Sequence, residues 1–323
     1  MKILVTGANG FVGRTLCADL VQRGFNVVAA VRRLAFEPAA VNPPRMQIEA
    51  VGDIGAHTDW TAALNGCACV VHLAARAHIM RDSASSPLAA FRAVNVDGTV
   101  QLARAALEAG IKRFVFVSSV GIHGNQNARA FTESDAARPA EDYAVSKLEA
   151  EQALRRELAG SAMELVIVRP PLVYGPGCPG NFLRLLKLLS SGVPLPFGAI
   201  DAKRSFVSVW NLADFLATCA VHENAANNVF LVSDMEDVAL PCLLEGLAGG
   251  MGHRAPIFPF PPGLLSMAAT MLGKGVMYDK LCGSLTVDAT HAQRTLNWCV
   301  PVSLAEGLHR TGKWYAQSRA ARA

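Results

Sequence analysis

The chain has 323 residues, of which 51% are apolar and 17% charged, and its net charge is +4. A chain of this length can bury a substantial core in one large or two modest domains, and none of its apolar runs is long enough to cross a bilayer. The cations form no basic block, so we expect neither stable membrane insertion nor a nucleic-acid partner.

The cysteines and the N-terminus indicate the compartment. Eight cysteines are scattered along the chain without paired CxxC motifs or metal-ligand spacing. This distribution is typical of reduced thiols and argues against a metal site. The first residues form a predicted strand and a glycine-rich motif rather than a signal peptide. We therefore expect a cytoplasmic protein.

The chain opens with an apolar run at 2–5, which is typical of a buried parallel strand, and a helix is predicted at 12–23. Three glycines lie at this junction. Gly7 permits a tight turn, Gly10 lets the backbone approach a pyrophosphate, and Gly13 lets helix and strand pack closely. The helix N-terminus would supply free N–H groups to phosphates. This context predicts a dinucleotide-binding fingerprint.

Strand-like and helix-like runs alternate through the first half of the chain. Such alternation predicts an α/β fold with a parallel sheet and helices on both faces. The further strands are expected at 26–31, 46–50, 69–73, 113–117 and 164–168, and the further helices at 58–64, 87–109 and 142–159.

The pattern changes after residues 169–171. A glycine-rich loop at 175–180 precedes a predicted helix at 181–190. A strand at 228–232 is expected to rejoin the sheet. From 236 onward the chain is rich in Pro and Gly, and only short helices are expected there.

We expect two domains, with the chain crossing between them. Residues 1–170 would form a dinucleotide-binding domain that is rejoined by about 204–233. Residues 171–203 and 234–323 would form a smaller C-terminal substrate domain that closes over the cofactor. The most apolar late segment, 263–276, is interrupted by polar residues and predicts a packed helix.

Tyr143 and Lys147 are four residues apart on the predicted helix 142–159, so they lie on one face, one turn from each other. An ammonium beside a phenol favours the phenolate and lowers a pKa that is normally about 10. A hydroxyl at the end of strand 113–117 could hold a substrate oxygen against that phenol. The pair alone is weak evidence, because the Tyr could simply pack and the Lys could be solvated.

These motifs keep a characteristic order and spacing: Gly7–Gly13, Gly52-Asp53, His72–Ala75, Asn95, Ser118-Ser119, Tyr143 with Lys147, 169–176, Arg204 and 288–298. Together they resemble the extended short-chain dehydrogenases/reductases. The closer likeness is to the branch of the NAD-dependent epimerase/dehydratase family that acts on nucleotide-diphosphate sugars. The resemblance runs nearly end to end. It implies a Rossmann-type doubly wound parallel sheet with a smaller C-terminal substrate domain.

The resemblance implies a role for each matching position. Ser119, Tyr143 and Lys147 would be catalytic, and Lys147 would also hold the nicotinamide ribose. Asp53 would bind the adenine amino group, unless it is only a turn residue after Gly52. Asn95 would orient Lys147, with a helix cap as the alternative. The cofactor-binding set would be Gly7, Asn9, Gly10, Phe11, Val12, Gly13, Arg32, Asp53, Ile54, Leu73, Ala74, Ala75, Asn95, Ser118, Tyr143, Lys147 and Pro170.

The implied substrate contacts are Ser119, Asn181, Phe197 and Arg204. Asn181 and Arg204 would bind the diphosphate of the sugar nucleotide, and Phe197 would pack on the nucleoside. Each has a plainer alternative: an N-cap for Asn181, a solvated cation for Arg204 and a core position for Phe197. His72 ends an apolar strand without a partner cluster, so we interpret it as a hydrogen-bonded core side chain.

Two departures from relatives bear on the chemistry. Ser119 is followed by Val120-Gly121, whereas related 4,6-dehydratases have an Asp-Glu pair, so dehydration is not expected. At the end of strand 26–31 stands Arg32, where NAD-preferring relatives have an acidic residue. An arginine attracts a 2′-phosphate, so we expect NADP(H), with NAD as the other option. The alternative for Arg32 is a solvated loop charge.

The preferred hypothesis is an NADPH-dependent C4 ketoreductase of a UDP-4-keto-6-deoxy-hexosamine in surface-polysaccharide synthesis, suggested also by segments 72–81 and 169–185. The main alternative is a UDP-sugar 4-epimerase with tightly bound NAD. A non-catalytic dinucleotide sensor and a reductase of hydrophobic ketones are further alternatives. Relatives also pack helices 87–109 and 142–159 across a two-fold axis, so a homodimer is expected.

Overall fold

A computed structural model describes residues 1–34, 45–77 and 86–321. Seven parallel strands form one sheet in the order β3-β2-β1-β4-β5-β6-β9. The strand order reverses between β1 and β4, as expected for a doubly wound Rossmann-type sheet. The predicted strand at 228–232 is confirmed, because β9 pairs with β6. The strands are β1 (Lys2–Thr6), β2 (Asn26–Val31), β3 (Met46–Ala50), β4 (Cys69–His72), β5 (Arg113–Val117), β6 (Glu164–Arg169) and β9 (Val229–Leu231).

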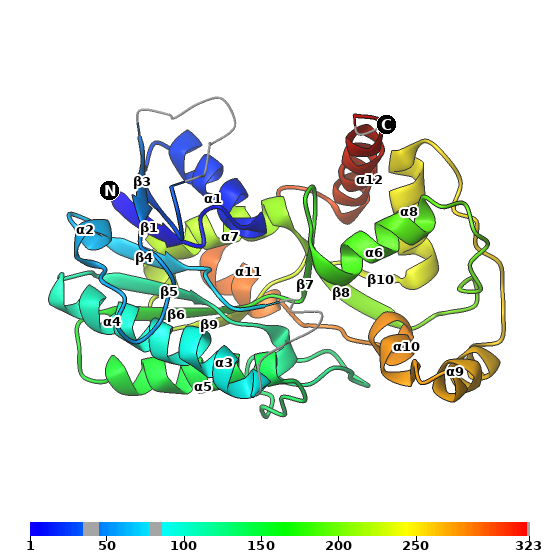
Figure 1. The fold of residues 1–323 in the computed structure, drawn as a ribbon, viewed down its shortest axis with the longest axis horizontal. Coiled ribbons are helices and arrows are strands. Elements are labelled where there is room, and N and C mark those ends of the chain that lie inside the picture. The colour runs from blue at the N-terminus through cyan, green and yellow to red at the C-terminus, as the bar shows by residue number, and fades with distance from the viewer. Residues whose placement is uncertain (35–44, 78–85, 322–323) are drawn as a thin grey trace.

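Helices cover both faces of this sheet (Figure 1). Side chains alternate along each strand, so β2 sends Val27, Ala29 and Val31 to one apolar core and Val28 and Ala30 to the other. On the first face lie α1 (Phe11–Gln22), α7 (Val209–Val221) and α11 (Thr290–Leu296); on the second lie α2 (Thr61–Leu64), α4 (Gly98–Glu108) and α5 (Asp142–Glu157).

The helix predicted over 87–109 is interrupted. It consists of α3 (Pro87–Arg92), a π-helical turn (Ala93–Asp97) and α4. The turn places the fully buried Asn95 toward the interior. Single π-helical turns are rare and frequently mark functional sites.

Other segments of the chain after residue 171 build a second, smaller part around a three-stranded sheet. Its strands are β7 (Leu172–Tyr174), β8 (Lys203–Ser208) and β10 (Asp237–Ala239), in the order β10-β8-β7. The helix predicted at 181–190 is present as α6 (Gly180–Leu189). With α8 (Leu240–Met251) and α12 (Leu304–Ala320), it encloses an apolar core of its own, visible on the right of Figure 1. We call this part the smaller half.

The prediction of a packed helix at 263–276 is wrong. The segment forms α9 (Pro262–Met271), a turn, and the start of α10 (Gly275–Cys282). None of the side chains of α9 is buried, and Met271 is 83% exposed. The physical reason is that α9 packs on α10, and of its side chains Leu265 reaches the core of the smaller half. Within the described residues, no helix is long and apolar enough to cross a bilayer.

Candidate active site

Most of the predicted cofactor residues gather at one edge of the large sheet, because they follow the carboxyl ends of its parallel strands. Ligands of doubly wound sheets bind at this edge, beside the point where the strand order reverses. Gly7 to Gly13 follow β1, Arg32 follows β2, Asp53 and Ile54 follow β3, Leu73 to Ala75 follow β4, Ser118 and Ser119 follow β5, and Pro170 follows β6.

The glycine loop is shaped for a close backbone approach. Gly7 has a φ of +65°, and a Cβ on it would lie 3.0 Å from Ala74 Cα. A Cβ on Gly13 would overlap the carbonyl oxygen of Gly7. Helix α1 begins without a side-chain cap and without an acidic residue in its first turn. Its first N–H groups, at Phe11 and Val12, therefore suit an anion such as a diphosphate.

Arg32 and Asp53, both predicted to bind the adenosine end of the cofactor, contact each other. Arg32 Nε lies 2.8 Å from Asp53 Oδ1, and the two side chains are 70% and 79% exposed. An exposed pair of this kind contributes little stability. It does matter for ligand choice, because a 2′-phosphate placed against Arg32 would also meet the Asp53 carboxylate.

Helix α5 carries Tyr143 and Lys147 in its first two turns. Tyr143 is partly buried, with its ring 6.2 Å from that of Phe91. Lys147 is buried, and its Nζ lies 4.0 Å from the centre of the Phe116 ring. Burial lowers the pKa of Lys147 to about 7, although Glu151 opposes the shift.

The expected lowering of the Tyr143 pKa is wrong for the phenol as it stands in this structure. Burial raises the pKa of Tyr143 to about 12. The reason is desolvation: burial of the phenol disfavours the phenolate, and it outweighs any favourable effect of the nearby Lys147 ammonium. The pair can still act in acid/base chemistry when a cationic or hydrogen-bonding ligand changes the balance between the two protonation states.

The two serines after β5 differ in their environment. Ser119 Oγ accepts a hydrogen bond from Gly121 N at 3.1 Å and caps a short 3₁₀ turn (Val120–Ile122). Ser118 is buried, and its Oγ lacks a hydrogen-bond partner among the described residues. An unsatisfied buried hydroxyl costs free energy unless a ligand completes it. This fits the prediction that Ser118 contacts the cofactor.

His72 is fully buried and hydrogen-bonded on both ring nitrogens, as interpreted from the sequence. Thr6 Oγ1 lies 2.7 Å from Nδ1 and accepts from the N–H groups of Leu73 and Ala74. Having used both lone pairs, that hydroxyl must donate to Nδ1, so the imidazole carries its proton on Nε2. Nε2 then donates to Thr99 Oγ1 at 2.9 Å. Burial lowers the pKa of His72 to about 3, which keeps it neutral.

The same series of hydrogen bonds continues to α5, the helix that carries Tyr143 and Lys147. Thr99 Oγ1 donates to the carbonyl oxygen of Asn95 at 2.7 Å. The Asn95 side chain bonds the backbone N–H and C=O of Arg76 and donates to Ser146 Oγ at 2.9 Å. Asn95 is thus no helix cap, and it contacts the residue before Lys147. Sequence reasoning missed Thr6, Thr99 and Ser146, although each adjoins a motif or lies one turn from a predicted residue.

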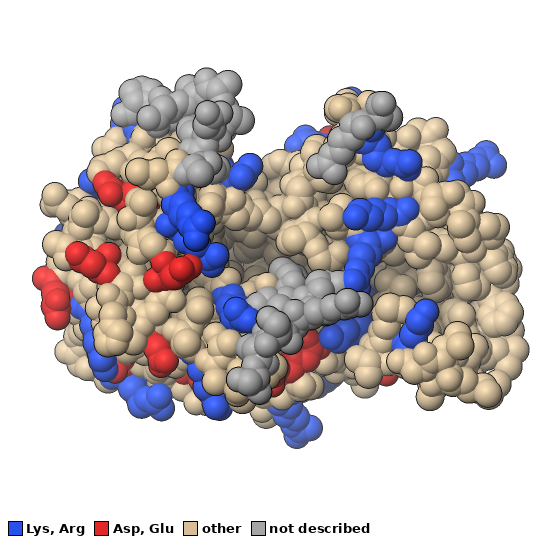
Figure 2. Space-filling model, viewed as in Figure 1, with Lys and Arg blue, Asp and Glu red and all other residues tan. Residues whose placement is uncertain are grey.

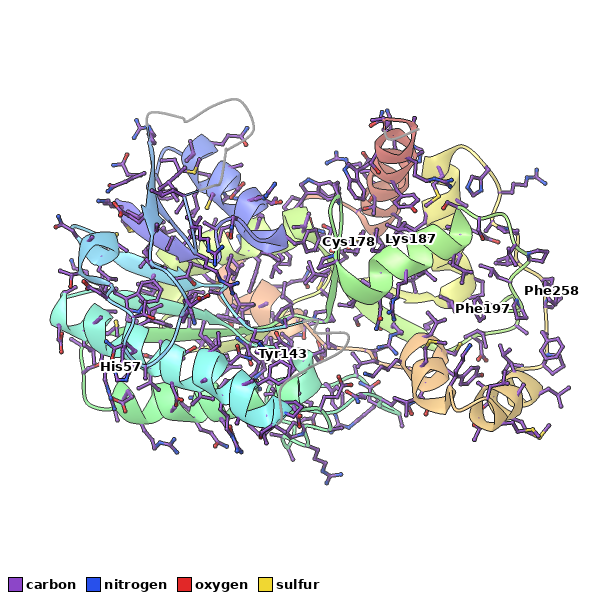
Figure 3. All side chains as sticks on the ribbon, viewed as in Figure 1. His57, Tyr143, Cys178, Lys187, Phe197 and Phe258 are labelled. Atoms are coloured by element: carbon purple, nitrogen blue, oxygen red, sulfur yellow. The ribbon has the colours of Figure 1, made fainter. Side chains whose placement is uncertain are left out.

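Apart from Ser119, the predicted substrate residues are spread over the smaller half. Asn181 is exposed in the first turn of α6, one residue past the helix start, so it is not the N-cap. Arg204 is no freely solvated cation: its Nη1 donates to Gly283 O at 2.8 Å, and burial lowers its pKa. Phe197 packs partly buried against the core, beside Phe258 and away from Tyr143 (Figure 3). The structure therefore does not bring Phe197 to the catalytic residues.

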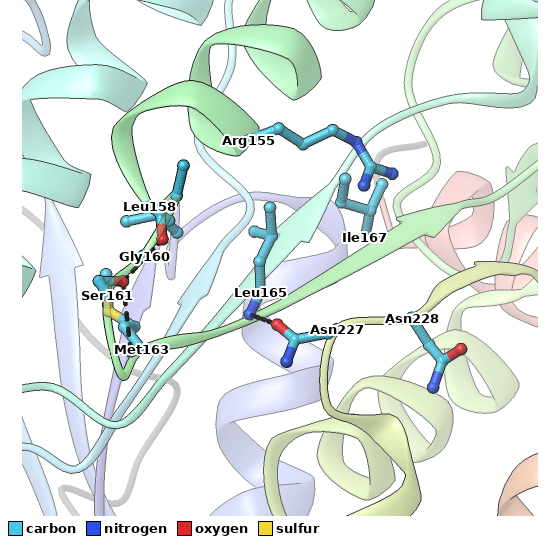
Figure 4. A pocket seen from close by; sticks show the side chains of 10 residues that line it. Arg155, Leu158, Gly160, Ser161, Met163, Leu165, Ile167, Asn227 and Asn228 are labelled. Atoms are coloured by element: carbon cyan, nitrogen blue, oxygen red, sulfur yellow. Dashed lines mark hydrogen bonds between the residues drawn. The ribbon is translucent and has the colours of Figure 1, made fainter.

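A cavity elsewhere in the fold and a metal centre are the two other kinds of site that a protein of this size could contain. A cavity of about 360 Å³ lies at the opposite end of the strands, below the end of α5, and contains none of the predicted residues (Figure 4). Its lining includes Arg155, Met163, Leu165 and Asn227. Within the described part of the chain, no group of three or more His, Cys, Asp or Glu side chains could hold a metal ion. Residues 78–81 of the segment compared with ketoreductases lie outside the described residues.

Comparison with known proteins agrees with this geometry. Residues 3–233 match the model of the NAD dependent epimerase/dehydratase family. The chain is 42% identical to a UDP-glucose 4-epimerase of Vibrio cholerae, over 98% of this chain and 96% of that one. It is 28% identical to the N-acetyl-alpha-D-glucosaminyl-diphospho-ditrans,octacis-undecaprenol 4-epimerase of Escherichia coli O157:H7, over 96% and 94%. The structure of MoeE5 in complex with UDP-glucose and NAD superposes with a TM-score of 0.77, at 25% identity and complete coverage of both chains.

Proposed function

Because the chain belongs to the NAD-dependent epimerase/dehydratase family, an enzyme family acting on nucleotide sugars, we propose that it is a UDP-sugar 4-epimerase with a resident NAD. The observation that carries the choice of cofactor is the ion pair of Arg32 with Asp53. Arg32 was the reason to expect NADP(H), and here its charge is partly neutralised by a carboxylate that disfavours a 2′-phosphate. The full-length likeness to a UDP-glucose 4-epimerase supports the same choice.

The proposed roles are those that the family resemblance implies, and the position of the residues at the carboxyl edge of the large sheet supports them. When bound, NAD supplies the acceptor and donor of hydride at C4. Tyr143 takes the proton of the C4 hydroxyl and returns it to the same oxygen, once the 4-keto sugar has turned its other face toward the source of hydride. Ser119 donates a hydrogen bond to the same oxygen, and Lys147 stabilises the phenolate and holds the nicotinamide ribose. Arg204 and Asn181 bind the diphosphate.

A ketoreductase using NADPH is the second candidate, because Arg32 remains highly exposed at the carboxyl end of β2 and could turn to a 2′-phosphate. Dehydration is disfavoured by the apolar Val120 and Gly121 after Ser119, since elimination needs an additional acid and base there. The part of the molecule built on the seven-stranded sheet would hold the dinucleotide, and the smaller half would hold the sugar nucleotide. The cytoplasmic location stays a prediction.

A homodimer through the helices at 87–109 and 142–159 also stays a prediction. We expect light scattering of the purified chain at micromolar concentration to give twice the mass of one chain. A single-chain mass would contradict it.

The test of the proposed function uses protein purified without added nucleotide. Heat or acid should release NAD, and incubation with UDP-glucose or UDP-N-acetylglucosamine should yield the C4 epimer without added cofactor. The NADPH-dependent reduction of a UDP-4-keto-6-deoxy-hexosamine, without epimerisation, would instead establish the ketoreductase. Tight dinucleotide binding without turnover of any UDP-sugar would favour the non-catalytic sensor.

A further inference from the structure

We propose that Glu151, held in place by Arg169, is a positioning residue that keeps the Lys147 side chain protonated beside Tyr143. This inference deepens the proposed function and rests on it, because that function gives Lys147 the task of stabilising the Tyr143 phenolate.

The charged groups concerned are buried, unlike most of those in this protein. Figure 2 shows acidic and basic side chains at the surface, lying beside one another over the part built on the seven-stranded sheet. Lys147, Glu151 and Arg169 are instead only 1%, 2% and 8% exposed. Buried charges are costly unless they are paired and hydrogen-bonded. The three groups therefore form a buried charged cluster.

Arg169 fixes the Glu151 carboxylate from the end of β6. Its Nε donates to Oε1 at 3.0 Å and its Nη2 donates to Oε2 at 2.6 Å, so the two side chains form a bidentate pair. Arg169 Nη1 donates to the carbonyl oxygen of Glu133 at 3.2 Å and lies 3.2 Å from His123 Nε2. Because the planar guanidinium is held at all three nitrogens, it leaves the carboxylate little freedom to turn.

Glu151 lies one turn beyond Lys147 on α5, so the two buried side chains share one face of the helix. An opposite charge at this spacing favours the ammonium form of lysine. Burial is the largest influence on the pKa of Lys147 and lowers it to about 7, and Glu151 is the group that opposes this shift. Without the carboxylate, Lys147 would be mostly uncharged at neutral pH and could not stabilise a phenolate.

The other titratable groups around Lys147 are neutral or are paired elsewhere. His72 on β4 and His123 after β5 are neutral at pH 7, because burial lowers the pKa of each. The β5 side chain under the ammonium is the uncharged Phe116. The arginines of α3 and α4 that meet α5 form ion pairs on its more exposed side: Arg92 with Glu149 and Arg104 with Glu157.

The charges of the cluster leave room for one further anion. When Lys147 is protonated, the cluster holds two cations and the single carboxylate of Glu151. Tyr143 is neutral in this structure, because burial raises its pKa to about 12. Ionisation of Tyr143 during the reaction would balance the excess positive charge. The cluster therefore favours the phenolate, provided that Lys147 keeps its proton.

The test measures the titration of Lys147 directly, by NMR of the nucleotide-free full chain labelled with [ε-¹³C]lysine. The Lys147 signal is identified by its loss in Lys147→Met. Glu151→Gln keeps the shape of the side chain and removes its charge, so it should weaken proton binding by Lys147 about tenfold or more. Glu151→Asp keeps the charge and should restore most of the proton affinity.

The matched control is Glu149→Gln. Glu149 lies on the same helix and also forms a bidentate pair with an arginine, because Arg92 Nε and Nη2 donate to its two oxygens at 2.8 and 2.6 Å. This pair lies on the more exposed side of α5. The titration of Lys147 in this variant should match that of the wild type.

Activity gives a second measurement and separates this inference from the proposed function. In the active enzyme, Glu151→Gln should move the high-pH limit of kcat about one unit or more toward lower pH, because Lys147 loses its proton earlier. A wild type that turns over no UDP-sugar would contradict the proposed function, while the NMR titration would still decide whether Glu151 holds the proton on Lys147.

Two outcomes would overturn the proposal: a Lys147 titration that is unchanged in Glu151→Gln, or equal shifts in Glu151→Gln and Glu149→Gln. If circular dichroism shows that Glu151→Gln does not fold, the double variant Glu151→Met/Arg169→Met takes its place. Apolar side chains of similar volume can replace a buried ion pair without loss of stability. This variant should show the same weakening of proton binding, and an unchanged titration in it would also overturn the proposal.

Discussion

Replacing Lys147 by methionine should stabilise the cofactor-free protein at neutral pH while abolishing its activity. The side chain is buried, and burial lowers its pKa from 10.5 to about 7. Between these values the unfolded chain binds one proton more than the folded chain, so wild-type stability rises with pH. Methionine keeps most of the apolar stem of lysine and removes the group that titrates.

The magnitude follows from the two pKa values. Lowering the Lys147 pKa from 10.5 to about 7 corresponds to about 4–5 kcal/mol when the pH lies below both values. The free energy of unfolding of the variant should therefore exceed that of the wild type by about 4 kcal/mol at pH 7.5 and by about 1–2 kcal/mol at pH 9.5. The change in this difference, about 2–3 kcal/mol, is the quantity to measure, because other titrating groups are common to both proteins.

The assay is urea unfolding of nucleotide-free protein, followed by circular dichroism at several pH values between 7 and 10. The matched control is Lys187→Met, which removes an exposed lysine from α6, and its difference from the wild type should stay flat with pH. A Lys147→Met protein that is less stable than the wild type at pH 7.5, or a difference that does not narrow toward pH 9.5, would refute the reasoning.

Three further predictions concern the site. Tyr143→Phe should lower kcat by about 10²–10⁴-fold and leave dinucleotide affinity within a few-fold; activity near the wild-type level would remove Tyr143 from proton transfer. The wild type should bind NADH more tightly than NADPH, as measured by fluorescence titration, and Arg32→Asp should widen this difference about tenfold or more because a second carboxylate would face the 2′-phosphate; a wild type that prefers NADPH would contradict the proposed cofactor. Gly13→Ala would place a Cβ against Gly7 O and 2.8 Å from Ala8 Cα, so dinucleotide affinity should fall about tenfold and stability by about 1–3 kcal/mol; normal nucleotide retention would contradict the close packing of α1 on β1.

The large sheet and its cofactor edge could be predicted from the sequence because both rest on local patterns. Apolar runs alternate with helical periods, and the residues after each strand necessarily meet at one edge once the strands are parallel. The packing of the last 90 residues was harder to predict. The apolar spacing of α9 is that of a helix in a core, and nothing in its sequence indicates that the helix stays exposed.

The electrostatics of the site could not be predicted in the same way. The Tyr143–Lys147 spacing predicts proximity, but the direction of the two pKa shifts depends on how deeply each group is buried, which distant segments of the chain decide. The pair of Arg32 with Asp53 joins the ends of two strands. The hydrogen-bond partners of His72 come from two other elements, Thr6 from β1 and Thr99 from α4, and contacts between distant segments leave no periodic signal in a single sequence.

The polarity of hydrogen bonds around His72 has a consequence for anyone transferring this site to another scaffold. Each donor in the series points the same way: the Thr6 hydroxyl donates to His72, His72 donates to Thr99, and Thr99 donates to the carbonyl oxygen of Asn95. An asparagine or glutamine in place of His72 could supply a donor and an acceptor, but not at the two points set by a rigid five-membered ring. Thr6, His72, Thr99 and Asn95 would therefore have to be transferred together. A graft of Tyr143 and Lys147 alone would lack the hydrogen bonds that connect α5 with the end of β1 beside the glycine loop.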